Sequence, residues 1–263
     1  MSKKSHLIFI LQFCLLASAH GAFPPSYTAT YDVEKSNLLV GQSTVTLNNE
    51  NENIHFSQEI ILAGFAAWFG DDQVTEDSWL TKIGDQHILS KYQYIYNNED
   101  NDENGDNGDD EENNLVSVES NRDVFFETQW KQNKDGTYSS VITGTTSGKP
   151  FTLDTAKLTW DTLSFQLALM NEITEKRKKY NYQILSKGKL KQYNFTLLDR
   201  GNIKINGENY NTVRLDRIQT NKVTKIWLAS DFHYIPILIE KYKDNKIDTR
   251  ATLTSLKIND EQK

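Results

Sequence analysis

Cysteine is almost missing from this chain. Cys14 is the one cysteine among 263 residues, and it lies in an apolar stretch close to the amino terminus. The rest of the chain can therefore form no disulfide, and it lacks the ligands of cysteine-based metal sites. Thiolate catalysis is excluded there for the same reason.

Long apolar runs are also missing. The apolar stretch at 7–16 is too short to span a bilayer. Lys3 and Lys4 precede it, and Ala17-Ser18-Ala19 follows it as a cleavage site, so residues 1–19 are predicted to be a signal peptide. We therefore expect a secreted protein that does not span a membrane, with residues 20–263 forming a single β-rich domain.

Signatures of common catalysts and nucleic-acid binders are absent. The chain has no H-E-x-x-H, no G-x-S-x-G and no glycine-rich phosphate loop. A formal net charge of −7 and a pI near 5.3 disfavour a nucleic-acid partner. We expect a protein that is not an enzyme and has no cofactor. A hydrolase would require a cleft with a buried Ser, His or carboxylate pair.

Alternating sequence is what the chain does contain. From Tyr27 onward, β-branched and aromatic residues alternate with polar ones in short runs, and turn residues separate the runs. Turns are expected at 187–188, 199–201, 206–207, 220–221 and 244–245, and a break in the sheet at 144–150. The pattern predicts a mainly β fold: a large curved antiparallel sheet, or an open β-barrel or meander.

One stretch departs from this alternation and predicts a helix from 161 to about 178. Asp161 is a good N-cap, because its carboxylate can accept hydrogen bonds from the amides of Leu163 or Ser164. Apolar residues then follow at helical spacing, and the basic run 176–179 would lie at the negative end of the helix dipole. An apolar helix needs a sheet to pack on, so we expect it on the concave face.

An apolar segment bounded by glycines, 63–70, is a candidate lid at one end of the sheet. It is either a loop that packs its aromatic side chains into the core or the rim of an apolar ligand pocket. The pocket hypothesis combines this segment with aromatic and aliphatic residues of the helix and one tryptophan of a late strand. Its predicted lining is Phe65, Trp68, Phe69, Trp160, Phe165, Leu167, Met170 and Trp227.

Residues 97–114 form an insertion of Asn, Asp, Glu and Gly alone. Such a composition predicts a disordered loop between paired strands, with no domain boundary. Part of it also matches the pattern of a calcium loop, through Asp100, Asp102, Asn104, Asp106 and Glu111. A four-letter segment matches that pattern easily by chance, and its flanks read as strands, so no metal site is assigned.

Two segments together resemble a known family. Asp161-Thr162-Leu163-Ser164 opens the apolar helix, and Trp227-Leu228-Ala229-Ser230-Asp231 runs toward Tyr234 and Pro236. With Tyr31 and Val40-Gly41, these motifs resemble a bacterial family of secreted proteins of unknown function, domain of unknown function 3108, over roughly residues 25–258. The resemblance implies a location in the Gram-negative envelope and brings no catalytic residue.

Two functions remain open at this point. The aromatic content favours a periplasmic protein that binds or carries a lipid-like ligand between sheet and helix. The alternative is an envelope module that binds a protein partner through a sheet edge or the acidic insertion.

Overall fold

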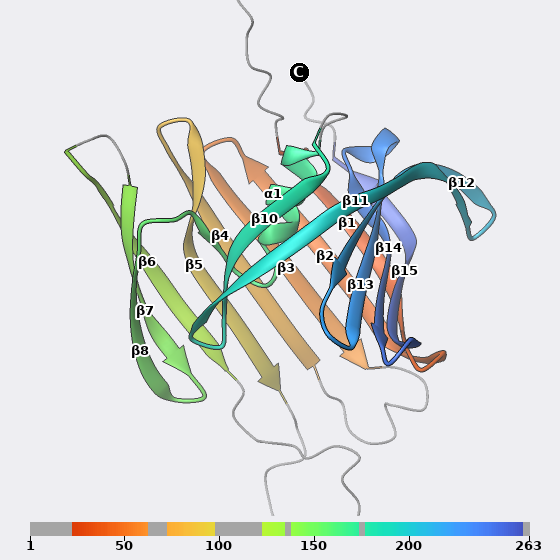
Figure 1. The fold of residues 1–263 in the computed structure, drawn as a ribbon, viewed down its shortest axis with the longest axis horizontal. Coiled ribbons are helices and arrows are strands. Elements are labelled where there is room, and N and C mark those ends of the chain that lie inside the picture. The colour runs from red at the N-terminus through yellow and green to blue at the C-terminus, as the bar shows by residue number, and fades with distance from the viewer. Residues whose placement is uncertain (1–22, 63–72, 98–122, 135–137, 174–176, 260–263) are drawn as a thin grey trace, which may run out of the picture.

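A computed structural model describes residues 23–62, 73–97, 123–134, 138–173 and 177–259 of the chain. All strands belong to one sheet, shown in Figure 1. The first eight are β1 (Tyr27–Lys35), β2 (Leu38–Glu50), β3 (Asn53–Leu62), β4 (Gln73–Ile83), β5 (Gln86–Asn97), β6 (Val124–Gln132), β7 (Tyr138–Thr146) and β8 (Lys149–Thr155). Then come β9 (Thr159–Trp160), α1 (Phe165–Glu172), β10 (Lys179–Ser186), β11 (Lys189–Ile205), β12 (Glu208–Ile218), β13 (Lys222–Ala229), the short helix η3 (Ser230–Phe232), β14 (Ile235–Lys243) and β15 (Lys246–Ile258).

The sheet is an antiparallel meander that returns to its start. Its spatial order is β8-β7-β6-β5-β4-β3-β2-β1-β15-β14-β13-β12-β11-β10-β9, so β1 pairs with both β2 and β15. Among the described strands, the one parallel pair joins β9 to β10. The predicted fold class is confirmed, because the sheet curves into a nearly closed, barrel-like shape around one α-helix (Figure 1).

The two edges of the sheet, β8 and β9, approach each other through β10. The side-chain amide of Gln183 on β10 donates to Thr155 Oγ1 of β8 at 2.7 Å and to Thr159 Oγ1 of β9 at 2.8 Å. Leu185, also on β10, packs in a hydrophobic cluster with Leu89 and other side chains of β5 to β7. Side-chain contacts therefore take the place of a last ladder of backbone hydrogen bonds.

The helix α1 lies inside the curve of the sheet and completes the main core. Leu163, Leu167 and Met170 are buried there together with large side chains of the early strands, among them Tyr27 and Phe56. This is the concave-face packing that the sequence predicts, and it buries most of the girth of the helix.

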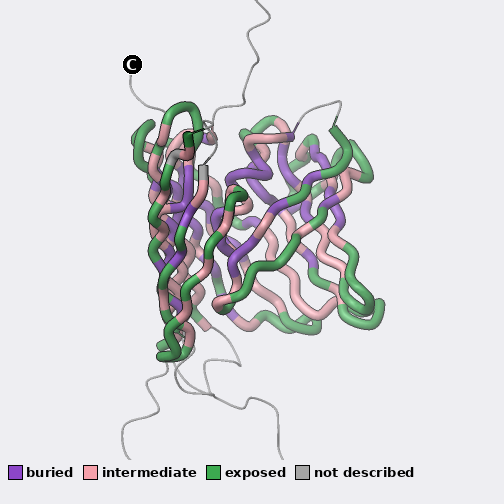
Figure 2. The backbone as a smooth tube through the Cα atoms, turned by 60° about the vertical axis from the view of Figure 1, so that its left-hand side comes forward, coloured by how far each residue is buried: buried purple, intermediate pink, exposed green. Residues whose placement is uncertain are grey.

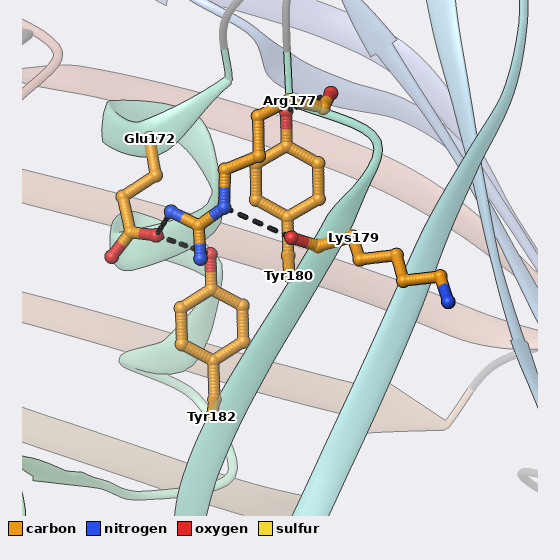
Figure 3. Close-up of polar contacts among 5 residues, drawn as sticks. All are labelled: Glu172, Arg177, Lys179, Tyr180 and Tyr182. Atoms are coloured by element: carbon orange, nitrogen blue, oxygen red, sulfur yellow. Dashed lines mark hydrogen bonds and ion pairs between the residues drawn. The ribbon is translucent and has the colours of Figure 1, made fainter.

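The helix is shorter than predicted. It begins at Phe165, after a turn at 162–164, and ends at Glu172, where Ile173 is already extended (φ −65°, ψ 120°). The residues described after α1 are not helical, so the basic run 176–179 does not lie at the end of the helix as expected. Arg177 instead forms an ion pair with Glu172 and donates to the Lys179 carbonyl at 2.9 Å (Figure 3).

Two tyrosines of β10 add hydrogen bonds around the Glu172–Arg177 ion pair. Tyr180 donates to the Arg177 carbonyl at 3.0 Å, and Tyr182 lies 3.4 Å from the Glu172 carboxylate (Figure 3). The alternation of Tyr180 and Tyr182 belongs to a strand, and this strand pattern overrides the continuation of the helix.

Two other expectations about strands are wrong, and one strand was not predicted. Residues 73–83 form the full strand β4, for which the sequence pattern gave no assignment. Residues 149–155 form β8, because Ser147 and Gly148 adopt positive φ and close a hairpin where a break was expected. The predicted turn at 199–201 lies within β11, where a register shift between Leu197 and Asp199 keeps the strand continuous.

Several predictions fall outside the described residues. They concern the signal peptide, the lid residues Phe65, Trp68 and Phe69, and the acidic insertion beyond Asn97 with its calcium-loop match, Asp100, Asp102, Asn104, Asp106 and Glu111.

Candidate functional site

The turn into α1 is held by its own first and last residues. Asp161 Oδ1 accepts from the amides of Leu163 (2.7 Å) and Ser164 (2.6 Å), as the sequence predicts. Ser164 Oγ donates to Asp161 Oδ2 at 2.8 Å and accepts from the Asp161 amide at 3.2 Å. Both side chains are fully buried. Asp161 therefore fixes the direction in which the chain enters the barrel.

A second set of polar contacts ties this turn to β4 and β5. Ser78 donates to Asp161 Oδ1 at 2.9 Å. Tyr92 donates to Glu76 Oε1 at 2.6 Å and lies 2.9 Å from the hydroxyl of Thr162, which also donates to Glu76. Two carboxylates, the buried Asp161 and the half-buried Glu76, thus hold the turn to these strands through two separate sets of hydrogen bonds.

Burial raises the pKa of both carboxyl groups. For Asp161 desolvation is the largest cause, and it brings the pKa to about 7 although the hydrogen bonds from Ser164 and Leu163 favour the charged form. Desolvation likewise raises the pKa of Glu76, which the hydroxyls of Thr162 and Tyr92 partly offset. A raised carboxyl pKa is common at functional sites, yet here every hydrogen-bond partner has a structural role in the helix entry.

The interior of the barrel has two unequal halves. Residues on and around α1 are buried, whereas residues toward the opposite end of the strands are mostly half-buried or exposed. Figure 2 colours the backbone by this burial. Strand alternation and register place the following half-buried residues on the inner face: Val33, Gln58, Ile60, Val74, Glu76, Tyr94, Tyr96, Ile239 and Ala251. We call this region the open half of the interior.

The open half is mainly apolar and comes from both sides of the sheet. Ile60, Val74 and Tyr96 are neighbours across β3, β4 and β5. On the other wall, Ile239 pairs with Ala251 across β14 and β15. Partly accessible apolar side chains on the inner face of a barrel are typical of a site for a small molecule with an apolar part.

A separate small cavity lies at the other end of the sheet. Its volume is about 130 Å³, and it is lined by Ile83, Gln86, Ile88, Trp130, Ala156 and Leu158. This volume is below the range of roughly 300–1,000 Å³ that holds a drug-sized ligand. Within the described residues, no group of three or more His, Cys, Asp or Glu could hold a metal ion.

The predicted pocket residues lie in three different settings. Trp160, Leu167 and Met170 are buried in the main core. Phe165 stacks on Phe195 at a centroid distance of 5.7 Å, on the interior side. Trp227 lies on the opposite face of β13 from the buried Ile226, with the Arg214 guanidinium 5.8 Å from its ring. The structure thus brings the helix residues together and leaves Trp227 apart from them.

Sequence reasoning missed the contributions of β4 and β5 to this region. Glu76, Ser78 and Tyr92 occupy inward positions on these strands, in register with one another. The sequence pattern that could have revealed β4 is the alternation of Val74, Glu76, Ser78 and Leu80. It is hard to recognise as a strand because two of these inward residues are polar.

The fold and the site define a class of protein: a nearly closed, barrel-like antiparallel sheet with one helix packed against its inner face. The chain belongs to the family described as protein of unknown function (DUF3108), whose model matches residues 26–253. A comparison with curated proteins gives no match. Within the described residues, no helix is both long and apolar enough to cross a bilayer.

Proposed function

We propose that this protein is a non-enzymatic periplasmic binding protein that carries one amphipathic, lipid-like molecule in the open half of its interior. The observation that carries the proposal is the set of partly accessible apolar side chains on the inner face, opposite the half that α1 occupies. Buried apolar surface is the main source of affinity for such a ligand. The signal-peptide pattern at 1–19 supports the periplasmic location.

The first test is native mass spectrometry of the protein purified gently from periplasm. We expect an additional mass that organic extraction removes. A clean apo mass, together with no uptake of an added amphiphile such as dodecanoate, would contradict the proposal. The alternative, a module that binds an envelope protein, would then become the leading hypothesis.

A matched pair of substitutions locates the ligand. Ala251→Phe places a large ring on the inner face beside Ile239 and Val33, and Thr252→Phe places the same ring on the outer face one residue away. The inner substitution should lower the bound fraction at least about tenfold, because it removes space that the ligand requires. The outer one should leave binding unchanged. Equal effects at the same melting temperature would contradict binding in the lumen.

A further inference from the structure

A row of basic residues crosses the inner face of five adjacent strands. Arg217 on β12 is opposite Thr224 on β13, which is opposite Lys241 on β14. The row continues through Thr249 on β15 to Lys35 on β1. Cations and threonines therefore alternate along it. We call Lys35, Arg217 and Lys241 the cationic belt.

The register places the belt next to the apolar wall. One step along the same strands toward α1, the inner face carries Ile226, Ile239, Ala251 and Val33 in a continuous row. Lys241 also interacts electrostatically with Glu76 on the opposite wall, which agrees with an inward direction of its side chain. The interior is therefore apolar near the helix and positively charged toward its open end.

The two arginines on the outer face of these strands are ion-paired, and the cations of the belt are not. Arg250 forms ion pairs with Glu34 (3.1 Å) and Glu240 (3.0 Å), and Arg214 forms one with Asp216 (3.0 Å). Within the described residues, no carboxylate lies within ion-pair distance of Lys35, Arg217 or Lys241. The outer arginines therefore have a counter-charge in contact, whereas the described residues supply none to the three cations of the belt.

Arg217 shows this most clearly. Its guanidinium lies 3.5 Å from the centroid of the Tyr193 ring, and Tyr193 contacts Phe165 of α1 edge-on. The side chain is half-buried, and its loss of solvent lowers the pKa of Arg217, which the contact with Tyr193 only partly offsets. Among the described residues, no carboxylate forms an ion pair with it. Asp248, the acid next to Thr249 in the row, accepts a hydrogen bond from that threonine and forms no ion pair with the belt.

On the basis of the proposed function, we infer that the ligand is a single-chain lipid with an anionic headgroup, a carboxylate or phosphate monoester. Its chain lies against Val33, Ile239 and Ala251, and its headgroup contacts the cationic belt. Adjacent strands are about 4.8 Å apart, so neighbouring cations of the belt stand about 10 Å apart and can reach one headgroup between them. The chain as a whole has a formal net charge of −7, which repels an anion. The attraction for the anionic headgroup must therefore come from the nearby cations of the belt.

The test compares amphiphiles with the same chain by isothermal titration calorimetry on the full mature protein. Dodecanoate and dodecyl phosphate should bind at least about tenfold more tightly than neutral monododecanoyl glycerol, since hydrogen bonds to charged groups are the stronger ones. Raising the salt concentration should weaken the two anionic ligands and leave the neutral one unchanged.

Variants then assign the effect to the belt. Arg217→Gln and Lys241→Gln should each weaken dodecanoate binding by roughly 3- to 30-fold without changing the affinity for monododecanoyl glycerol. Lys225→Gln is the control. Lys225 lies on the outer face of β13 over the Tyr242 ring (4.1 Å), and its substitution removes the same charge as the belt variants do. It should not change either affinity.

Each other result contradicts a defined part of this inference. Equal affinity for the neutral and anionic amphiphiles, or belt variants that behave like Lys225→Gln, would overturn the anionic headgroup and leave the proposed function intact. Acetate or inorganic phosphate binding as tightly as dodecanoate would reduce the site to one for a free anion. Tighter binding of dodecylamine would assign the headgroup to Glu76. No binding of any amphiphile would refute the proposed function itself.

Discussion

At the scale of residues, the polar side chains inside this barrel hold segments together that are distant in sequence. Asp161 joins the helix entry to β4 through Ser78, and Tyr31 on β1 donates to the carbonyl of Pro236 on β14 at 2.8 Å. Both contacts are buried. The motifs by which this chain resembles its family, the Asp161–Ser164 turn and Tyr31 with Pro236, therefore have a structural role that the hydrogen bonds explain.

The raised pKa of Asp161 predicts a dependence of stability on pH. An unfolded Asp ionises near pH 3.9, whereas folded Asp161 keeps its proton up to about pH 7. Between these values the folded state binds more protons, so the free energy of unfolding should fall as the pH rises from 4 to 7. Asp161→Asn should flatten this slope, leaving the part due to Glu76. Thermal unfolding at several pH values measures this slope for the protein and for the variant. The same slope in both would show that Asp161 does not titrate between pH 4 and 7.

Tyr31→Phe should be destabilising by about 1–2 kcal/mol, because it leaves the buried Pro236 carbonyl without its donor. Tyr210→Phe is the matched control. Its hydroxyl donates to Glu208 in an exposed setting, so its loss should change the free energy of unfolding by less than about 0.5 kcal/mol. Denaturant unfolding compares the two, and equal effects would contradict the role assigned to Tyr31.

At the scale of elements, α1 owes its position to packing and its length to the strand that follows. Its eight residues are too few for an isolated helix to be stable in water. Leu167, Ala168, Leu169 and Met170 are all buried, so the helix is stable only where the barrel surrounds it. The helix therefore depends on the core and does not form a separate folding unit.

Leu167→Ala should lower the free energy of unfolding by about 2–5 kcal/mol, because it leaves a cavity among fully buried side chains. Gln166→Ala, at the neighbouring half-buried position, should cost less than about 1 kcal/mol. A small effect of Leu167→Ala would mean that the helix can withdraw from the barrel at low cost.

At the scale of the whole molecule, the barrel depends on contacts between the two edges of its sheet. Gln183 on β10 bonds to both β8 and β9. Gln183→Ala should therefore speed amide exchange in these two strands and lower stability by about 1–2 kcal/mol. Gln192, directly opposite on β11, is exposed, so Gln192→Ala is the control and should leave exchange unchanged. Equal exchange in both variants would contradict closure through Gln183.

The sequence by itself determined the mainly β class, the antiparallel meander, the one helix and the hydrogen bonds that Asp161 accepts in the turn before it, although the helix itself begins after Ser164. These depend on local periodicity and on hydrogen bonds between residues close in sequence. It could not determine that β4 and β8 are strands, because polar inward residues at Glu76 and Ser78 and the Gly148 hairpin obscure their patterns.

Only the tertiary structure decided where α1 ends and which side chains share the interior. Arg217, Lys241 and Lys35 are far apart in sequence, and they form one row only because β15 returns to pair with β1. Strand order and register are set by long-range pairing, and local sequence does not contain this information.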